Sequence, residues 1–296
     1  DFFLRWYGPN NAILTIAGDV NSSEVIRIVD KYFGSINRGP HVRKMRPNIP
    51  RLTTDVYNGY TDNIYLPMTD MVFPTVPRYH KDEAPLDILS SLMGEGNNSI
   101  FYKNFVKSEK AIQALVYNPC RELSGEFHFS VVSYPDWQID QQTYFNNIEK
   151  LIRSSIEEWE TSGFTDDQLN MAKMTMESSI IDYKMSLSSK VTMMSQWEWL
   201  ANGKYNISSE INRYNNVTRE DVMRVYNKYI KNKNAVIINV KPKSPFSDED
   251  LVLESFNPNA NLILENDPQY NGLTYNKPKS EFDACCRSNK PSPSTP

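Results

Sequence analysis

The sequence has few of the residues on which redox and metal sites depend. Its 296 residues include only three cysteines and three histidines. Cys285 and Cys286 are adjacent and Cys120 lies far from both, which gives neither a disulfide framework nor paired Cys-x-x-Cys metal ligands. Cys120 has no recognisable base near it in the sequence, so a thiol nucleophile is not indicated. The cysteines therefore leave the redox compartment open.

Long apolar runs and blocks of like charge are also missing. No stretch approaches the roughly 18 to 20 apolar residues that span a bilayer. The 32 basic and 36 acidic residues are interspersed, so there is no basic footprint for nucleic acid. The first residues lack the order of a signal peptide, but the start is expected to be truncated, which leaves the localisation unknown.

The three histidines do not form a metal motif. His41, His80 and His128 are far apart, and no two stand three or four residues apart as in a helical zinc site. His80 begins a His-x-x-Glu without a second histidine and is expected at the surface. His128 alternates with Phe127 and Phe129, so it is expected on the opposite face of a strand. The Gly-x-Ser-x-Gly, phosphate-loop and Gly-x-Gly-x-x-Gly motifs are also absent.

What is present is a globular composition, 40% apolar and 23% charged, with strands and helices in a mixed order. Apolar and β-branched runs predict strands at residues 11–20, 56–60, 65–73, 111–117, 126–133 and 235–240. Helical spacing predicts helices at residues 21–33, 86–93, 100–106, 148–159, 165–185, 191–200 and 218–229. This order favours an α+β unit with a largely antiparallel sheet and helices packed on one face.

Composition suggests four segments. Residues 1–36 are interpreted as the strand and helix that end a preceding unit, and residues 37–51, rich in proline and basic residues, as a linker. Residues 52–243 form the main domain. Residues 244–296 are polar and irregular and are expected to be a linker or an extended tail.

Two short stretches of the chain have the same pattern. Tyr7 precedes Asn11-Ala12 and an apolar run, and Tyr229 precedes Asn234-Ala235 and another apolar run. Each has an aromatic residue, a short polar turn, Asn-Ala and a strand-like segment. The repeat suggests a duplicated architecture, in which the chain opens on the end of one unit and continues through the next.

Four stretches, in order, resemble the insulinase/pitrilysin (M16) family of zinc metallopeptidases. They are FFLRWYGPNNAILTIAGDV with SSEVIRIVDKYFGSI, LDILSSLMGEGNNSIFYKNFVKSEKAIQALVY, GFTDDQLNMAKMTM, and VTREDVMRVYNKYIKNKNAVIINV. Together they extend over about residues 1 to 243. The chain most resembles the second, non-catalytic domain of the N-terminal half of such a peptidase.

The resemblance implies a LuxS/MPP-like metallohydrolase fold and a place beside a catalytic unit. In the family, a His-x-x-Glu-His motif with a further glutamate holds Zn²⁺, and the motif glutamate takes a proton from the zinc-bound water. This motif is absent here and is expected upstream of Asp1. The implied partners are a catalytic M16 domain, in the same parent chain or in a partner subunit, and a peptide substrate. Zinc is expected in the parent protein and no cofactor in this fragment.

One segment is a candidate for substrate contact. Gly94, Gly96, Asn97 and Asn98 match a glycine-rich bend that is thought to touch substrate in the family's processing subunits, although Glu95 and the asparagines depart from the glycine run. Glycine lets a backbone approach a peptide closely, but a plain helix break is the simpler interpretation.

Two hypotheses follow. In the first, the fragment contributes chamber wall and scaffold to a zinc endopeptidase and is inactive alone. In the second, it belongs to a catalytically inactive M16-like scaffold or partner subunit. A small-molecule binding module would need converging polar groups in a pocket, which no motif indicates.

Overall fold

The computed structural model describes residues 2–136, 138–183 and 185–243. Within these residues the chain divides into two units. The N-terminal unit contains residues 2–44 and 186–199, and the larger unit contains residues 45–185 and 200–243. The predicted tail at 244–296 lies outside the described residues.

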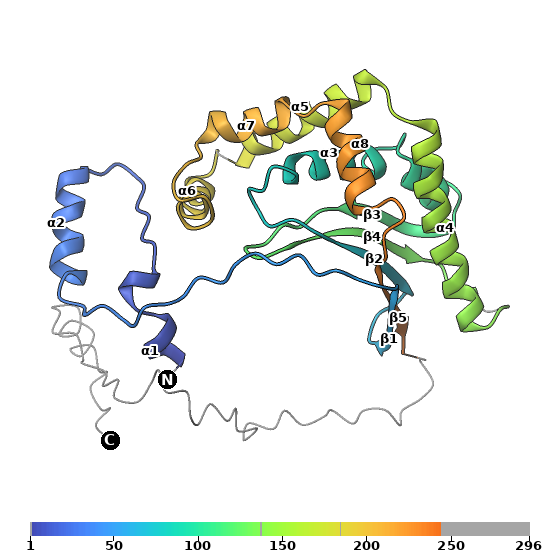
Figure 1. The fold of residues 1–296 in the computed structure, drawn as a ribbon, viewed down its shortest axis with the longest axis horizontal. Coiled ribbons are helices and arrows are strands. Elements are labelled where there is room, and N and C mark those ends of the chain that lie inside the picture. The colour runs from blue at the N-terminus through green and yellow to red at the C-terminus, as the bar shows by residue number, and fades with distance from the viewer. Residues whose placement is uncertain (1, 137, 184, 244–296) are drawn as a thin grey trace, which may run out of the picture. The chain divides into compact units, whose positions relative to one another are not determined.

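A five-stranded sheet forms the centre of the larger unit (Figure 1). Its order is β1-β5-β2-β4-β3, and only the β1–β5 pair is parallel. The prediction of a largely antiparallel sheet is therefore confirmed. The strands are β1 (Val56–Asp62), β2 (Met68–Thr75), β3 (Ala111–Tyr117), β4 (Gly125–Ser133) and β5 (Val236–Pro242).

The sheet separates a covered face from a face without helices. Along β4 burial alternates strictly, as the period of two in a strand requires. Phe127 and Phe129 are fully buried in the core, whereas His128 lies on the other face with its side chain 12% exposed. The predicted alternation of this strand is confirmed.

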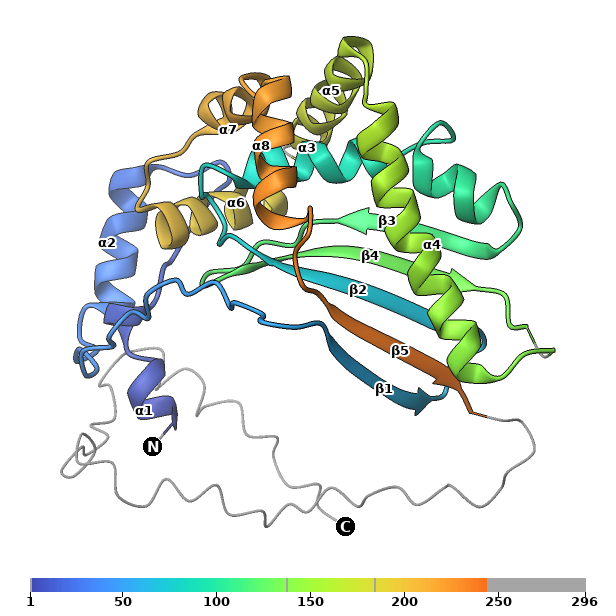
Figure 2. The ribbon, with the colours of Figure 1, turned by 45° about the vertical axis from the view of Figure 1, so that its right-hand side comes forward.

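The helices of the larger unit lie on one side of the sheet (Figures 1 and 2). α4 runs across β2, α8 also packs on β2, and α3 packs on β3. The bounds of the helices are α3 (Glu83–Gly94), α4 (Gln141–Ser162), α5 (Asp166–Tyr183), α7 (Ile207–Asn215) and α8 (Arg219–Tyr229), with a π-helical turn at Tyr102–Val106. α7 was not predicted, because its nine residues are mostly polar.

The N-terminal unit contains α1 (Phe2–Trp6), a 3₁₀ turn at Pro9–Asn11, α2 (Ser22–Phe33) and most of α6 (Leu187–Ala201). The strand predicted at residues 11–20 is wrong for this chain. Residues 12–17 form no ladder with the described residues, and a strand needs a neighbour for its backbone groups.

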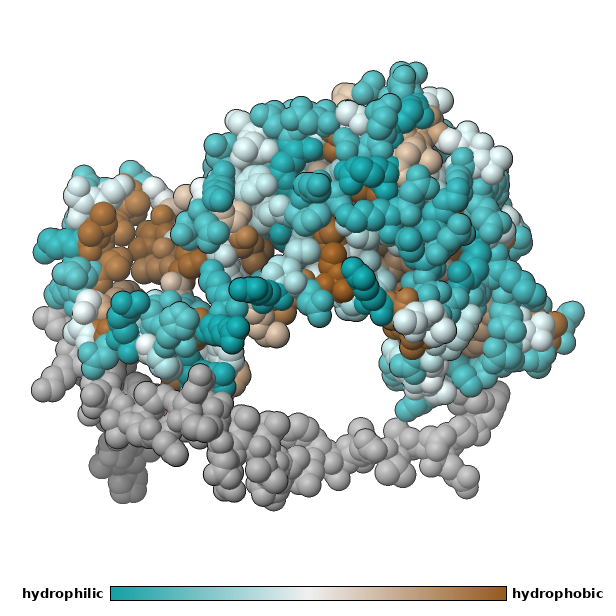
Figure 3. Space-filling view, in the orientation of Figure 1, coloured by the Kyte–Doolittle hydropathy of each residue, from teal (hydrophilic) through white to brown (hydrophobic). Residues whose placement is uncertain are grey.

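Apolar side chains of the N-terminal unit remain uncovered. Figure 3 shows a hydrophobic area beside α2. Ile26 on α2 is 68% exposed and Leu14 is 58% exposed, and α2 buries no residue completely. The apolar side chains of α2 are thus half-buried or exposed among the described residues.

None of the helices in the described ranges is both long enough and apolar enough to cross a membrane.

Candidate functional site

The glycine-rich bend follows the end of α3. Gly94 is the last residue of the helix and packs against β3, where an added Cβ would lie 2.8 Å from the Cβ of Val116. Gly96 has a φ of +76° and open space around it. Asn97 and Asn98 are exposed. The structure thus brings the four predicted residues together, with a packing role for Gly94 and an accessible surface at the other three.

The described residues do not fit a zinc ion. No group of three or more histidine, cysteine, aspartate or glutamate side chains among them has the geometry of a metal site. His128 and His80 belong to separate hydrogen-bond clusters, and burial raises the pKa of the Cys120 thiol, which keeps it protonated and a poor ligand. No step of zinc chemistry can be assigned to this part of the chain.

The helix-free face of the sheet carries a mixed row of side chains. Successive register pairs define one row that crosses all five strands on this face. The row contains Leu115, Ser130, Asp70, Ile238 and Asn58. All five are at least partly exposed. This face therefore offers both apolar and hydrogen-bonding surface without a helix of its own unit to cover it.

His128 is the centre of a polar group on the helix-free face. Its Nδ1 lies 2.9 Å from Asp70 Oδ2, its Nε2 lies 3.2 Å from Glu126 Oε2, and its ring stacks on Tyr117 at 4.6 Å. Burial alone would lower the pKa of His128, but the hydrogen bonds and charges of Asp70 and Glu126 outweigh it and raise the pKa. The imidazolium form is favoured because both ring nitrogens then donate to carboxylates.

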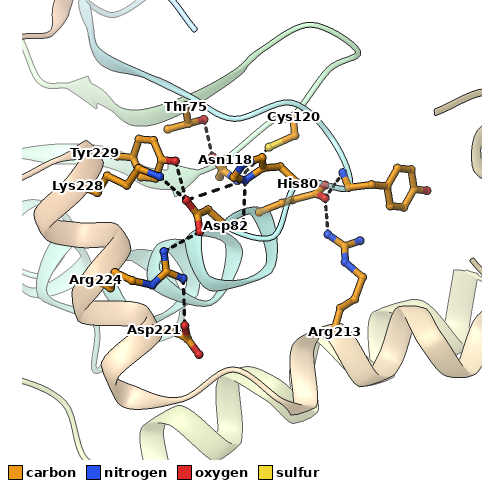
Figure 4. Close-up of polar contacts among 12 residues, drawn as sticks. Thr75, His80, Asp82, Asn118, Cys120, Arg213, Asp221, Arg224, Lys228 and Tyr229 are labelled. Atoms are coloured by element: carbon orange, nitrogen blue, oxygen red, sulfur yellow. Dashed lines mark hydrogen bonds and ion pairs between the residues drawn. The ribbon is translucent and has the colours of Figure 1, made fainter. Parts of the chain in front are cut away.

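A second polar cluster centres on Asp82, just before α3 (Figure 4). Its side chain is fully buried. Arg224 donates to it at 2.6 Å, Lys228 at 2.8 Å and the Tyr229 hydroxyl at 2.7 Å. All three donors lie on α8, so this one carboxylate ties the start of α3 to the last helix of the unit.

The three donors determine the charge of Asp82. Burial alone would raise the pKa of this carboxyl group, but the hydrogen bonds from Lys228, Tyr229 and Arg224 outweigh burial and hold the pKa well below its usual range. Arg224 also pairs with Asp221 at 3.0 Å, while Lys228 pairs with Asp82 alone among the acids of the described residues. The cluster therefore stays ionised at neutral pH.

An adjoining acidic cluster connects α3 to α7. Glu83 is 6% exposed and accepts hydrogen bonds from the Tyr79 backbone and from Arg213, which also binds Glu210. Asp87 accepts from Asn118 at 2.8 Å and from Tyr214 at 2.9 Å. These pairs join the faces of α3 and α7 in the core of the unit.

The acids outnumber the cations in this adjoining cluster. Burial, with the charge of Glu83 added, raises the pKa of Asp87 to about 7. Burial also raises the pKa of Glu210. The charge of Arg213 lowers that pKa and the charge of Glu83 raises it, so the net shift is upward. Structural ion networks perturb pKa values as active sites do, and these groups pair with one another in the core of the unit, so the cluster is interpreted as structural.

The Asp82 cluster was missed from the sequence. The sequence predicts a surface position for His80 and no role for Asp82, yet Asp82 and Glu83 are buried while His80 is partly exposed and Lys81 is exposed. The partners of Asp82 lie 142 to 147 residues away. The only local signal is the pair Arg224 and Lys228, which stand one turn apart beside Tyr229 on the predicted helix.

Comparisons with known proteins agree with this fold. A model of the family described as the peptidase M16 inactive domain matches residues 1–176. The zinc protease PqqE of Helicobacter pylori is 24% identical over 249 residues, which cover 81% of this chain and 54% of that protein. The chain thus spans about half the length of that relative.

Solved structures show the same fold. A protease from Helicobacter pylori superposes with a TM-score of 0.69 at 24% identity, covering 81% of this chain and 57% of the other. A peptidase M16 inactive domain from Pseudomonas fluorescens has a TM-score of 0.61 at 16% identity, covering 77% and 52%. Because the family model matches more than half of the chain, this protein belongs to the M16 peptidase family through its inactive, non-catalytic domain.

Proposed function

We propose that this chain acts as the non-catalytic part of a zinc metalloendopeptidase. Its partner is a catalytic M16 domain, in the same longer chain or in a separate subunit, that carries the His-x-x-Glu-His motif and the zinc. The observation that carries the proposal is the match to the inactive-domain model over residues 1–176, in a chain whose described residues have no set of zinc ligands.

The proposed contribution to catalysis is a wall of the chamber that holds the peptide substrate. The helix-free face supports this assignment because it presents Leu115, 44% exposed, beside the polar side chains of Ser130 and Asp70. Apolar surface with a few hydrogen-bonding groups is typical of sites that hold peptides. The exposed part of the glycine-rich bend, Gly96 with Asn97 and Asn98, is proposed as a second contact.

The first experiment measures zinc and activity of the chain alone. We expect no stoichiometric zinc by elemental analysis and no hydrolysis of a mixed peptide substrate. One tightly held zinc per chain, or hydrolysis that a chelator abolishes, would contradict a non-catalytic role.

The second experiment tests the chamber wall in the assembly with the catalytic domain. Leu115→Arg places a charge on the helix-free face, and the matched control Asn147→Arg places the same charge on the exposed side of α4. We expect Leu115→Arg to lower kcat/KM about tenfold or more, because the arginine charge would lose its water when the peptide binds over it. Equal activities of the two variants would refute the wall assignment, and an assembly without activity would favour the inactive scaffold.

A further inference from the structure

A pocket of about 860 Å³ lies at the end of the sheet where β2 finishes and β5 begins. One wall is the segment Pro47–Leu52 and another is the turn Asn232–Asn234, and His80, Lys228 and Tyr229 also line the pocket. The walls are joined by a hydrogen bond from Asn234 Nδ2 to Leu52 O of 3.0 Å. The pocket therefore belongs to the framework of the larger unit.

The lining of the pocket is basic. Arg51, Lys228 and Lys233 line it, and no acidic side chain does. Arg51 and Lys233 make no side-chain hydrogen bond or ion pair within the part of the chain that the structure describes. Lys228 shares Asp82 with Arg224, and Arg224 also pairs with Asp221, so two carboxylates balance these two cations.

Among the described residues that line the pocket, the charge that opposes Arg51 and Lys233 is partial. α8 ends at Tyr229, and the exposed carbonyl groups of a helix C-terminus carry about half a negative charge. Two full charges on Arg51 and Lys233 outweigh it. The local potential of the pocket is therefore positive.

His80 adds a hydrogen-bond donor to the lining. Its Nδ1 accepts from the Asp82 backbone N–H at 3.0 Å (Figure 4), so the neutral imidazole carries its proton on Nε2. Burial lowers the pKa of His80, which favours this neutral form at pH 7. Apolar groups complete the lining, since Pro47, Ile49 and Pro50 form the same wall as Arg51.

We propose that this pocket binds a carboxylate carried on an apolar body, such as the C-terminus or an acidic side chain of a peptide. The cations Arg51 and Lys233 hold the carboxylate, and the proline-rich wall and Tyr229 contact the apolar part. Guanidinium and carboxylate groups match in planar geometry, which favours Arg51 as the main contact. The inference does not depend on the proposed function.

The test compares three probes that differ in their carboxylate. N-acetyl-phenylalanine carries a C-terminal carboxylate, N-acetyl-phenylalaninamide carries none, and N-acetyl-glutamic α-amide carries one on its side chain. Binding to the full chain is followed by the shifts of the backbone amides of residues 232–234 in NMR spectra at low ionic strength. We expect at least one acid to bind roughly tenfold more tightly than the neutral amide, and the advantage to shrink as salt is added.

Variants of the two free cations identify the contact. Arg51→Gln and Lys233→Gln are each expected to weaken binding of the acid about threefold, the size of one partly exposed ion pair, and to leave binding of the amide unchanged. Lys150→Gln, on the exposed side of α4 and away from the pocket, is the control and should change neither.

The relative affinities of the three probes identify the ligand. If N-acetyl-phenylalanine is preferred over the glutamic amide, the ligand is a peptide C-terminus, and the reverse order indicates an acidic side chain. Equal binding of the acids and the neutral amide, or no binding of any probe at millimolar concentration, overturns the proposal. So does loss of acid binding in Lys150→Gln to the same extent as in Arg51→Gln.

Discussion

Replacing Asp82 with asparagine tests whether the buried carboxylate holds the last helix in place. The substitution keeps the shape of the side chain and removes its charge. Asp82 accepts charged hydrogen bonds from Arg224 and Lys228, and a bond of this type contributes about 1.5–3 kcal/mol. The side chains of the two cations are 42% and 52% exposed, so they regain water when the carboxylate is lost.

Asp82→Asn is therefore expected to lower the free energy of unfolding by about 2–3 kcal/mol, close to the contribution of one such bond. The larger penalty for leaving a fully buried ion unpaired does not apply. For a unit of this size the melting temperature should fall by about 5–10 °C in thermal unfolding followed by circular dichroism. Asp166→Asn is the control. Its pair with Arg219 is equally short, 2.7 Å, but the carboxylate is 84% exposed, so we expect a loss of about 0.5 kcal/mol or less.

The pH dependence of stability separates charge from packing. Because the pKa of Asp82 is lower in the folded chain than in the unfolded one, its stabilising contribution is present above about pH 4 and is lost as the pH falls further. The difference between wild type and Asp82→Asn should therefore shrink at pH 3. A variant as stable as wild type at pH 7, or a difference that is the same at pH 3 and pH 7, would refute the assignment of an ionised carboxylate.

Three further predictions concern other parts of the larger unit. The pKa of Asp87, raised to about 7, means that its ionisation opposes folding, so stability should decline from about pH 4 to pH 7, and Asp87→Asn should reduce that decline in denaturant titrations. Gly94→Ala should lower the free energy of unfolding by about 1–3 kcal/mol, because the added methyl overpacks against β3. Gly96→Ala should lower it by about 1 kcal/mol, because of the positive φ alone. Equal losses in chemical unfolding would contradict this difference. In an NMR titration, the pKa of His128 should lie above its usual value, and the stability that the charged ring contributes should be lost as the pH rises through that pKa. Asp70→Asn should lower this pKa. An unshifted pKa in the wild type would contradict the pairing.

Regular elements of the fold were predictable because their signals are local. The alternation of phenylalanines with His128 defines a strand with one buried face, and this is what β4 shows. The apolar stripe from Ile148 to Trp159 defines the buried side of α4, and both residues are in the core. Such patterns need no knowledge of the rest of the chain.

The polar clusters were not predictable because their partners are distant in sequence. Asp82 follows a histidine and a lysine, a context typical of solvent-exposed charge, and its burial depends on α8 closing over it. Charged residues are buried only where they are paired, and a sequence does not state which of its many cations will be the partner. The same limit applies to the basic pocket, whose walls come from residues 47–52 and 232–234.

The repeated Asn-Ala pattern shows how far local sequence determines a strand. At Asn234-Ala235 the Ala235 N–H donates to Asp55 Oδ1 at 2.8 Å, and the chain continues as β5 between β1 and β2. At Asn11-Ala12 the Asn11 side chain donates back to Trp6 O at 2.9 Å, and residues 12–17 have no strand beside them in the part of the chain that the structure describes.

The two segments have similar β propensity and differ in what lies next to them. A β-strand is completed by the hydrogen bonds of its neighbours, and residues 12–17 have none among the described residues. The side chains of Ile13 and Ile16, 44% and 46% exposed, are then surface that a neighbouring sheet would cover. Under the proposed function, we expect the catalytic domain to supply that neighbouring sheet.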